Sequence, residues 1–226
     1  MVEVALTLSE PRWREAVLIF NTQPALWLHD SWFDRLPQGS IARRLRTVPQ
    51  AAPWVSCYLL RAFGLEQRHC LDFASPWARL ALLDGPALER LFLHLGLALR
   101  HRDLGQEILG EQLRRLKTAL SAAEWNFAVK RAPLLGAIPL FTFEPDTADL
   151  RTGFTLIGGR FCAVHLTPFG RPLLARLTLK LPATWSATLN LSAAPAVSGS
   201  VTGADLPPLL RKLLKDLLPT WNPLFA

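Results

Sequence analysis

Apolar residues recur through most of this chain at the three- and four-residue spacing of an amphipathic helix. The last segment shows this best: Asp205 suits an N-cap, leucines then follow on one helix face, and charged residues occupy the other. We predict that this helix is part of the core, because packed amphipathic helices are the ordinary case. A basic helix lying on a membrane is the alternative. The apolar face consists of Leu206, Leu209, Leu210, Leu213, Leu214, Leu217 and Leu218.

The same spacing predicts helices earlier in the chain. Asp84 suits the cap of a helix that carries leucine and phenylalanine at helical spacing. Ser121 and Glu124 form a capping box, which predicts another helix start. Segment 134–166 contains prolines and several glycines, so we expect its helices to be short. Further short helices are predicted over 13–20, 39–47 and 54–64.

Segment 168–182 is ambiguous. Leu173, Leu174 and Leu177 suit a helix, whereas the leucines at 177, 179 and 181 alternate as in a strand. Both interpretations stay open from the pattern alone, because a short apolar run fits either period.

These elements predict a mainly α fold, a compact bundle of many short helices forming a single domain over residues 1–226. A minor β element near 177–181 is left open. The stretch 190–205 is small, polar and rich in helix breakers, so we predict a flexible loop there.

Charge and cysteine content narrow the classes of protein. The chain has a formal charge of +7, with its densest basic cluster at Arg43, Arg44 and Arg46. A nucleic acid, an anionic membrane or an acidic protein would suit that charge. The three cysteines have no paired spacing, which favours a reducing compartment over a disulfide framework. We see no secretory leader and no apolar stretch long enough to span a membrane.

Candidate catalytic chemistry lacks its partners. The run from His101 to Leu104 spells the HRDL of a kinase loop, but Ile108 stands where a magnesium-binding Asn is required. We therefore interpret it as a helix junction, with Asp103 capping the next helix. His94 and His101 could share a helix face, yet the sequence has no metal-binding spacing. We expect no catalytic, cofactor or metal site, and an enzyme of unrecognised type is the least favoured class. A Cys–His pair at Cys162 and His165 is weighed against plain core packing, which is more common.

An aromatic run over 27–33 is the other candidate feature. Trp27, Trp32 and Phe33 most simply belong to a core, whereas exposed tryptophans near arginine would mark a protein interface. We therefore place Trp27 and Trp32 with Arg43, Arg44 and Arg46 as candidate partner-binding residues.

Several segments occur in an order that resembles a known family. They are QPALWLHDSWFDRLP, ASPWARLALLDGPALERLFLHLGLALRHRDL, RLTLKLP and the terminal LLPTWNPLFA. Together they resemble the K protein of the type III secretion system's cytoplasmic sorting platform, the SctK, YscK and PscK family. The resemblance runs from about residue 20 to the end of the chain.

This resemblance implies a non-enzymatic, virulence-associated adaptor in protein transport. Such proteins lie in the cytoplasm at the inner membrane, held there through protein contacts. They link the cytoplasmic domain of the inner-membrane ring protein to the pods, which contain the cytoplasmic-ring protein and the ATPase-linker protein. The expected partners are these three proteins, with no nucleic acid and no cofactor. A basic helical protein that binds nucleic acid or a membrane surface is the alternative function.

Overall fold

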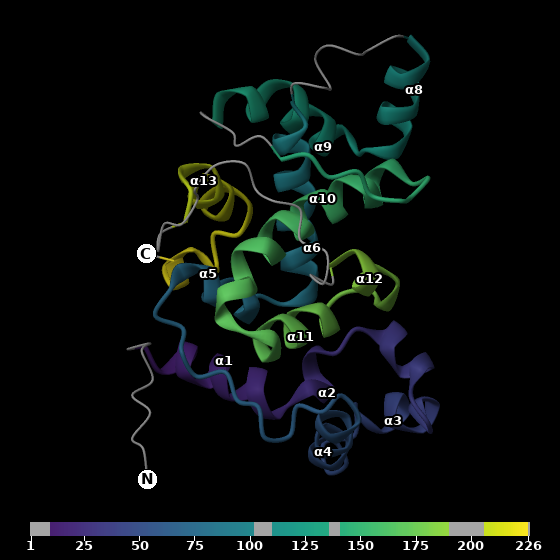
Figure 1. Ribbon diagram of the computed structural model, residues 1–226, viewed down its shortest axis with the longest axis vertical. Helices are drawn as coiled ribbons and strands as arrows, with labels where there is room; N and C mark the ends of the chain where they lie inside the picture. Colours follow the sequence, from purple (N-terminus) through teal and green to yellow (C-terminus); the bar gives the residue numbers. More distant parts are fainter. Residues whose placement is uncertain (1–9, 102–109, 136–140, 190–205, 226) are drawn as a thin grey trace. The chain divides into compact units, whose positions relative to one another are not determined.

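The computed structural model describes residues 10–101, 110–135, 141–189 and 206–225, and every regular element within them is a helix (Figure 1). This confirms the mainly α fold with many short helices. The chain forms two compact units: unit 1 comprises Met1–Gly85 and Leu166–Ala187, and unit 2 comprises Pro86–His165 and Thr188–Ala226. A single domain over 1–226 stays a prediction, and the loop predicted at 190–205 lies outside the described residues.

Unit 1 consists of short helices joined by tight turns. Prolines begin α1, α2 and α5. The first N–H groups of a helix have no partner within it, so proline, which lacks an N–H, costs no hydrogen bond there. Gly64 has a positive φ of 63° after α4, so the helix predicted over 54–64 ends where expected. The elements are α1 (Pro11–Thr22), α2 (Pro24–Trp27), η1 (Asp30–Arg35), α3 (Gly39–Leu45), α4 (Ala52–Ala62), α5 (Pro76–Arg79), η2 (Leu80–Leu82), η5 (Thr167–Phe169), α11 (Arg171–Leu179) and η6 (Ala183–Trp185).

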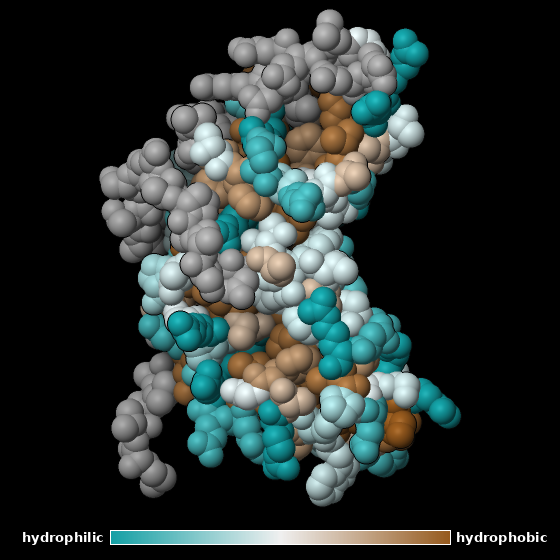
Figure 2. All heavy atoms as spheres, turned by 45° about the vertical axis from the view of Figure 1, so that its right-hand side comes forward, coloured by the Kyte–Doolittle hydropathy of each residue, from teal (hydrophilic) through white to brown (hydrophobic). Residues whose placement is uncertain are grey.

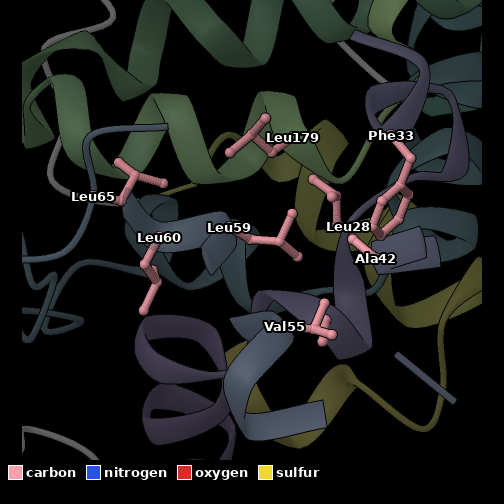
Figure 3. Close-up of a cluster of buried hydrophobic side chains, with 9 residues drawn as sticks. Leu28, Phe33, Ala42, Val55, Leu59, Leu60, Leu65 and Leu179 are labelled. Carbon is pink, nitrogen blue, oxygen red and sulfur yellow. The ribbon is translucent and has the colours of Figure 1, made fainter. Parts of the chain in front are cut away.

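A cluster of buried apolar side chains holds the helices of unit 1 together (Figure 3). It combines residues from α2 to α4 with Leu179 of α11, which is distant in the sequence. The stretch from Leu166 to Ala187 is therefore an integral part of a unit whose other residues come from the first part of the chain. The cluster consists of Ala25, Leu28, Phe33, Ala42, Val55, Leu59, Leu60, Leu65 and Leu179.

The β element left open near 177–181 is not formed. Helix α11 continues to Leu179, and Lys180 follows as its C-cap. The leucines at 177, 179 and 181 alternate, but Lys180 between them is buried too, so the alternation does not separate a buried face from a solvated one.

Unit 2 includes the two longest helices of the described chain, α6 and α10. The capping box predicted at Ser121 and Glu124 is present at the start of α9, with both reciprocal hydrogen bonds. The elements are α6 (Gly85–Leu99), α8 (Gly110–Ala119), α9 (Ala122–Asn126), the π-helix η3 (Phe127–Arg131), η4 (Ala132–Leu135), α10 (Leu150–Leu166), α13 (Pro208–Leu217) and η8 (Asn222–Phe225); α12 (Ser186–Leu189) begins in unit 1 and ends in unit 2.

The expectation of only short helices in 134–166 was wrong, because α10 has 17 residues. Its glycines serve helix packing. A Cβ at Gly158 would lie 2.0 Å from the carbonyl oxygen of Phe92 in α6, and a Cβ at Gly96 would lie 1.8 Å from that of Phe154 in α10. The two helices therefore approach through glycine more closely than any side chain would allow.

The core prediction for the final helix is confirmed. All the leucines of its predicted apolar face are buried, while Arg211, Lys212, Lys215 and Asp216 are exposed. The predicted Asp205 cap lies outside the described residues, as does the Asp103 junction. Among the helices that the structure describes, none combines the length and apolar character needed to cross a bilayer.

Candidate interaction surface

Helix α3 carries the predicted arginine cluster and packs one face against η1. Gly39, Ala42, Arg43 and Arg46 follow the i, i+3, i+4, i+7 spacing of a single helix face. Gly39 and Ala42 are buried. A Cβ at Gly39 would lie 1.8 Å from the carbonyl oxygen of Phe33, so only glycine permits this approach of α3 to η1.

Arg43 and Arg46 bind η1 of their own unit. Arg43 donates to the carbonyl oxygen of Asp30 at 2.8 Å and to Oδ1 of Asp34 at 2.7 Å. Arg46 pairs with the carboxylate of Asp30. Both guanidinium groups lie over the ring of Phe33, at 5.6 and 5.1 Å from its centroid. Two of the three predicted arginines therefore hold α3 in place; their role in partner binding stays a prediction.

The opposite face of α3 is exposed and largely apolar. Ile41, Arg44 and Leu45 lie on α3, and Val48 follows in the turn after it; we call these four residues the α3 stripe. The exposed fractions are 55% for Ile41, 41% for Leu45 and 41% for Val48, and Arg44 is exposed as well. Figure 2, with the side of the molecule that bears α3 turned forward, shows hydrophobic surface among hydrophilic side chains in the lower part of the view. Sequence reasoning found Arg44 but missed its apolar neighbours.

Trp27 and Trp32 face the interior of unit 1. Both are partly buried and pack against its apolar cluster. The Trp27 indole donates to the carbonyl oxygen of Ile19 at 3.1 Å, and that of Trp32 donates to the carbonyl oxygen of Leu181 at 2.9 Å. Their visible role is to tie segments of unit 1 together. The exposed tryptophan is Trp54 at the start of α4, with 78% of its surface accessible, and sequence reasoning missed it.

Two buried cations on the inner side of α11 were also missed. Arg176 is fully buried and donates to the carbonyl oxygens of Arg68 at 2.6 Å and Leu65 at 3.2 Å. Lys180 donates to the carbonyl oxygens of Ala81 and Leu83, both at 2.7 Å. The sequence contains a signal for them, because Arg176 and Lys180 recur at the same helical spacing as the buried leucines of α11.

Burial sets the protonation behaviour of Lys180. It lowers the pKa of the ammonium from 10.5 to about 7, and the charge of Asp84 opposes that change. The ammonium also lies 4.9 Å from the centroid of Phe20, a contact that favours the charged form.

Each histidine considered for catalysis contacts a backbone carbonyl, and Cys162 lies in the core. His94 is buried, which lowers its pKa, and its Nδ1 lies 2.8 Å from the carbonyl oxygen of Arg90 one turn earlier. Nδ1 of His101, which follows α6, lies 2.9 Å from the carbonyl oxygen of Ala98 in that helix. Cys162 is fully buried, and burial raises the pKa of its thiol, so it lies in the core rather than in a reactive site. Within the described residues, no group of three or more metal-ligating side chains gathers.

The described chain is thus a helical protein whose buried charges hold its own backbone and whose exposed surface includes an apolar and basic helix face. These features are typical of a structural or interaction protein. The model of the family described as YOP proteins translocation protein K (YscK) matches residues 17–225, and the chain belongs to this family. It is therefore a component of a type III secretion system, in a family that is a structural part of the secretion apparatus and not a known enzyme family. No curated protein and no solved structure showed a significant match.

Proposed function

We propose that this protein is a non-enzymatic adaptor of the type III secretion sorting platform. It links the cytoplasmic domain of the inner-membrane ring protein to the pods, through their cytoplasmic-ring and ATPase-linker proteins. It works in the cytoplasm at the face of the inner membrane and is held there by protein contacts. The observation that carries the proposal is the family match, which extends over nearly the whole chain.

The internal construction of unit 1 supports an adaptor, because a link between two partners must transmit position. The stretch 65–75 has little regular structure, yet side chains hold its backbone at several points. Asn21 of α1 donates to the carbonyl oxygen of Cys70 and accepts from its N–H, both at 2.7 Å. Arg176 binds the carbonyl oxygens of Leu65 and Arg68. Such bonds give an irregular segment a defined place in its unit.

The proposal is tested by binding of purified components. The full chain is mixed with the cytoplasmic domain of the ring protein, the cytoplasmic-ring protein and the ATPase-linker protein, singly and in pairs. An adaptor forms a ternary complex that contains the ring protein and a pod protein together. If the chain binds none of them, or if the ring and pod proteins compete for one place, the adaptor proposal is wrong.

The arginine cluster has its own test within this assay. Arg44 is the member whose guanidinium is free to meet a partner, so Arg44→Glu should weaken binding and reduce its salt dependence. Changing Arg43 or Arg46 would also break the contacts with Asp34 and Asp30 that hold α3. Equal binding by Arg44→Glu and the wild type would remove the cluster from the interface.

A further inference from the structure

The α3 stripe has the polarity opposite to that of an ordinary surface helix. A helix packed on a protein core turns its apolar side chains inward and its charges outward. In α3 and the turn after it, Arg43 and Arg46 face η1, while Ile41, Leu45 and Val48 are exposed. Single exposed apolar residues are common, but here Ile41 and Leu45 lie one turn apart on α3, and exposed Val48 follows in the turn after the helix.

Helix α3 cannot roll to bury this stripe. Rolling α3 would move Gly39 away from the carbonyl oxygen of Phe33, a position where a residue with a Cβ would clash. It would also break the bonds of Arg43 and Arg46 to Asp30 and Asp34. The exposure of the stripe is therefore built into the packing of α3 on η1.

The charge around the stripe favours an acidic partner. Between Asp34 and Glu66 the sequence contains no Asp or Glu, but it contains five arginines. Arg43 and Arg46 are balanced by carboxylates of η1, and Arg61 pairs with Glu66. Arg44 lies within the stripe, and no carboxylate of the described chain pairs with it.

We propose that the α3 stripe inserts into an apolar groove, rimmed by carboxylates, on a partner protein of the secretion apparatus. This inference rests on the proposed adaptor function and names the surface that serves one of its two contacts. An exposed helix whose apolar anchors recur at i and i+4, as Ile41 and Leu45 do, is the shape that such grooves accept. The helical part of the stripe, from Ile41 to Leu45, spans about 6 Å at the helical rise of about 1.5 Å per residue.

The same features disfavour two other occupants. A second copy of this chain, docked symmetrically through the stripe, would bring two Arg44 side chains together. A membrane would receive only three short apolar side chains, without the broad apolar face of an interfacial helix. Both remain measurable outcomes of the test.

The test compares matched variants of the full chain. Ile41→Ser with Leu45→Ser removes the two apolar anchors that lie on α3, and Arg44→Glu reverses the charge. The controls are Leu134→Ser, at an apolar residue of unit 2 with 78% exposure, and Arg131→Glu, at an exposed arginine of unit 2. Because all these positions are exposed, the variants should fold, and circular dichroism checks that they do.

Dissociation constants are measured against the purified ring-protein domain, the cytoplasmic-ring protein and the ATPase-linker protein, at low and high salt. For one of the three, the double variant should raise Kd at least about tenfold, as expected for buried interface anchors. Arg44→Glu should raise Kd and flatten its salt dependence. Both controls should stay within about twofold of the wild type.

The outcomes separate this inference from the proposed function. If a partner binds wild type and stripe variants equally, the α3 proposal is overturned while the adaptor function stands. If the wild-type chain binds none of the three proteins, both are overturned. Stripe-dependent dimerisation in light scattering, or stripe-dependent sedimentation with phosphatidylglycerol vesicles, in place of protein binding would also overturn it.

Discussion

Replacing Arg176 by methionine tests whether a buried cation holds unit 1 together. Methionine keeps much of the side-chain volume but donates no hydrogen bond. The change removes the Arg176 donor from the carbonyl oxygens of Arg68 and Leu65, of which the Leu65 oxygen still accepts from the N–H of Arg68 at 3.1 Å; the contact to Asn21, at 3.5 Å, is weak. We therefore expect unit 1 to lose the attachment of 65–75 to α11.

The magnitude follows from two well-formed bonds. Hydrogen bonds to a charged group contribute roughly 1.5–3 kcal/mol each. Part of this loss is offset, because Arg176→Met removes the desolvation cost of burying a cation. The net decrease in the free energy of unfolding should be about 3 kcal/mol, which lowers the urea midpoint by about 1–2 M.

The assay is urea unfolding followed by tryptophan fluorescence, with Arg171→Met as the control. Arg171 is the first residue of the same helix and is exposed, so its variant should match the wild type within about 0.5 kcal/mol. A loss of less than about 1 kcal/mol in Arg176→Met would refute the reasoning, since it would mean that the carbonyls find other donors at little cost.

Three further changes test other parts of the structure. Because burial lowers the pKa of Lys180 to about 7, the unfolded chain holds more protons than the folded one above that pH. The free energy of unfolding should therefore rise by roughly 2 kcal/mol between about pH 7 and pH 9, and Lys180→Met should lack this rise in urea titrations; equal slopes would contradict it. Gly158→Ala should destabilise unit 2 by about 3 kcal/mol or more, because its Cβ would meet the backbone of α6, while Gly110→Ala, with open space around it, should be neutral or slightly stabilising in thermal melts. Ser121→Ala should lower the free energy of unfolding by about 1 kcal/mol through loss of the capping box, and an unchanged urea midpoint would show that the box contributes nothing.

The candidate surface was only partly predictable. Charge density along the sequence located Arg43, Arg44 and Arg46, but it could not separate the two that bind η1 from the one that is exposed. That separation depends on Asp30 and Asp34, which lie on another element. The tryptophans show the same limit, because the acceptors of Trp27 and Trp32 are backbone carbonyls of other segments.

The sequence by itself determined the helical class, the capping box at Ser121, the end of α4 near Gly64 and the buried face of the final helix. These follow from local spacing and capping chemistry, which act within a few residues. Only the tertiary structure decided that α10 continues through its glycines, that α11 buries two cations, and that the apolar face of α3 is the outer one. The first two depend on segments distant in the sequence, and the orientation of α3 depends on the backbone and carboxylates of the neighbouring η1. The spacing of apolar residues along the chain records neither kind of contact.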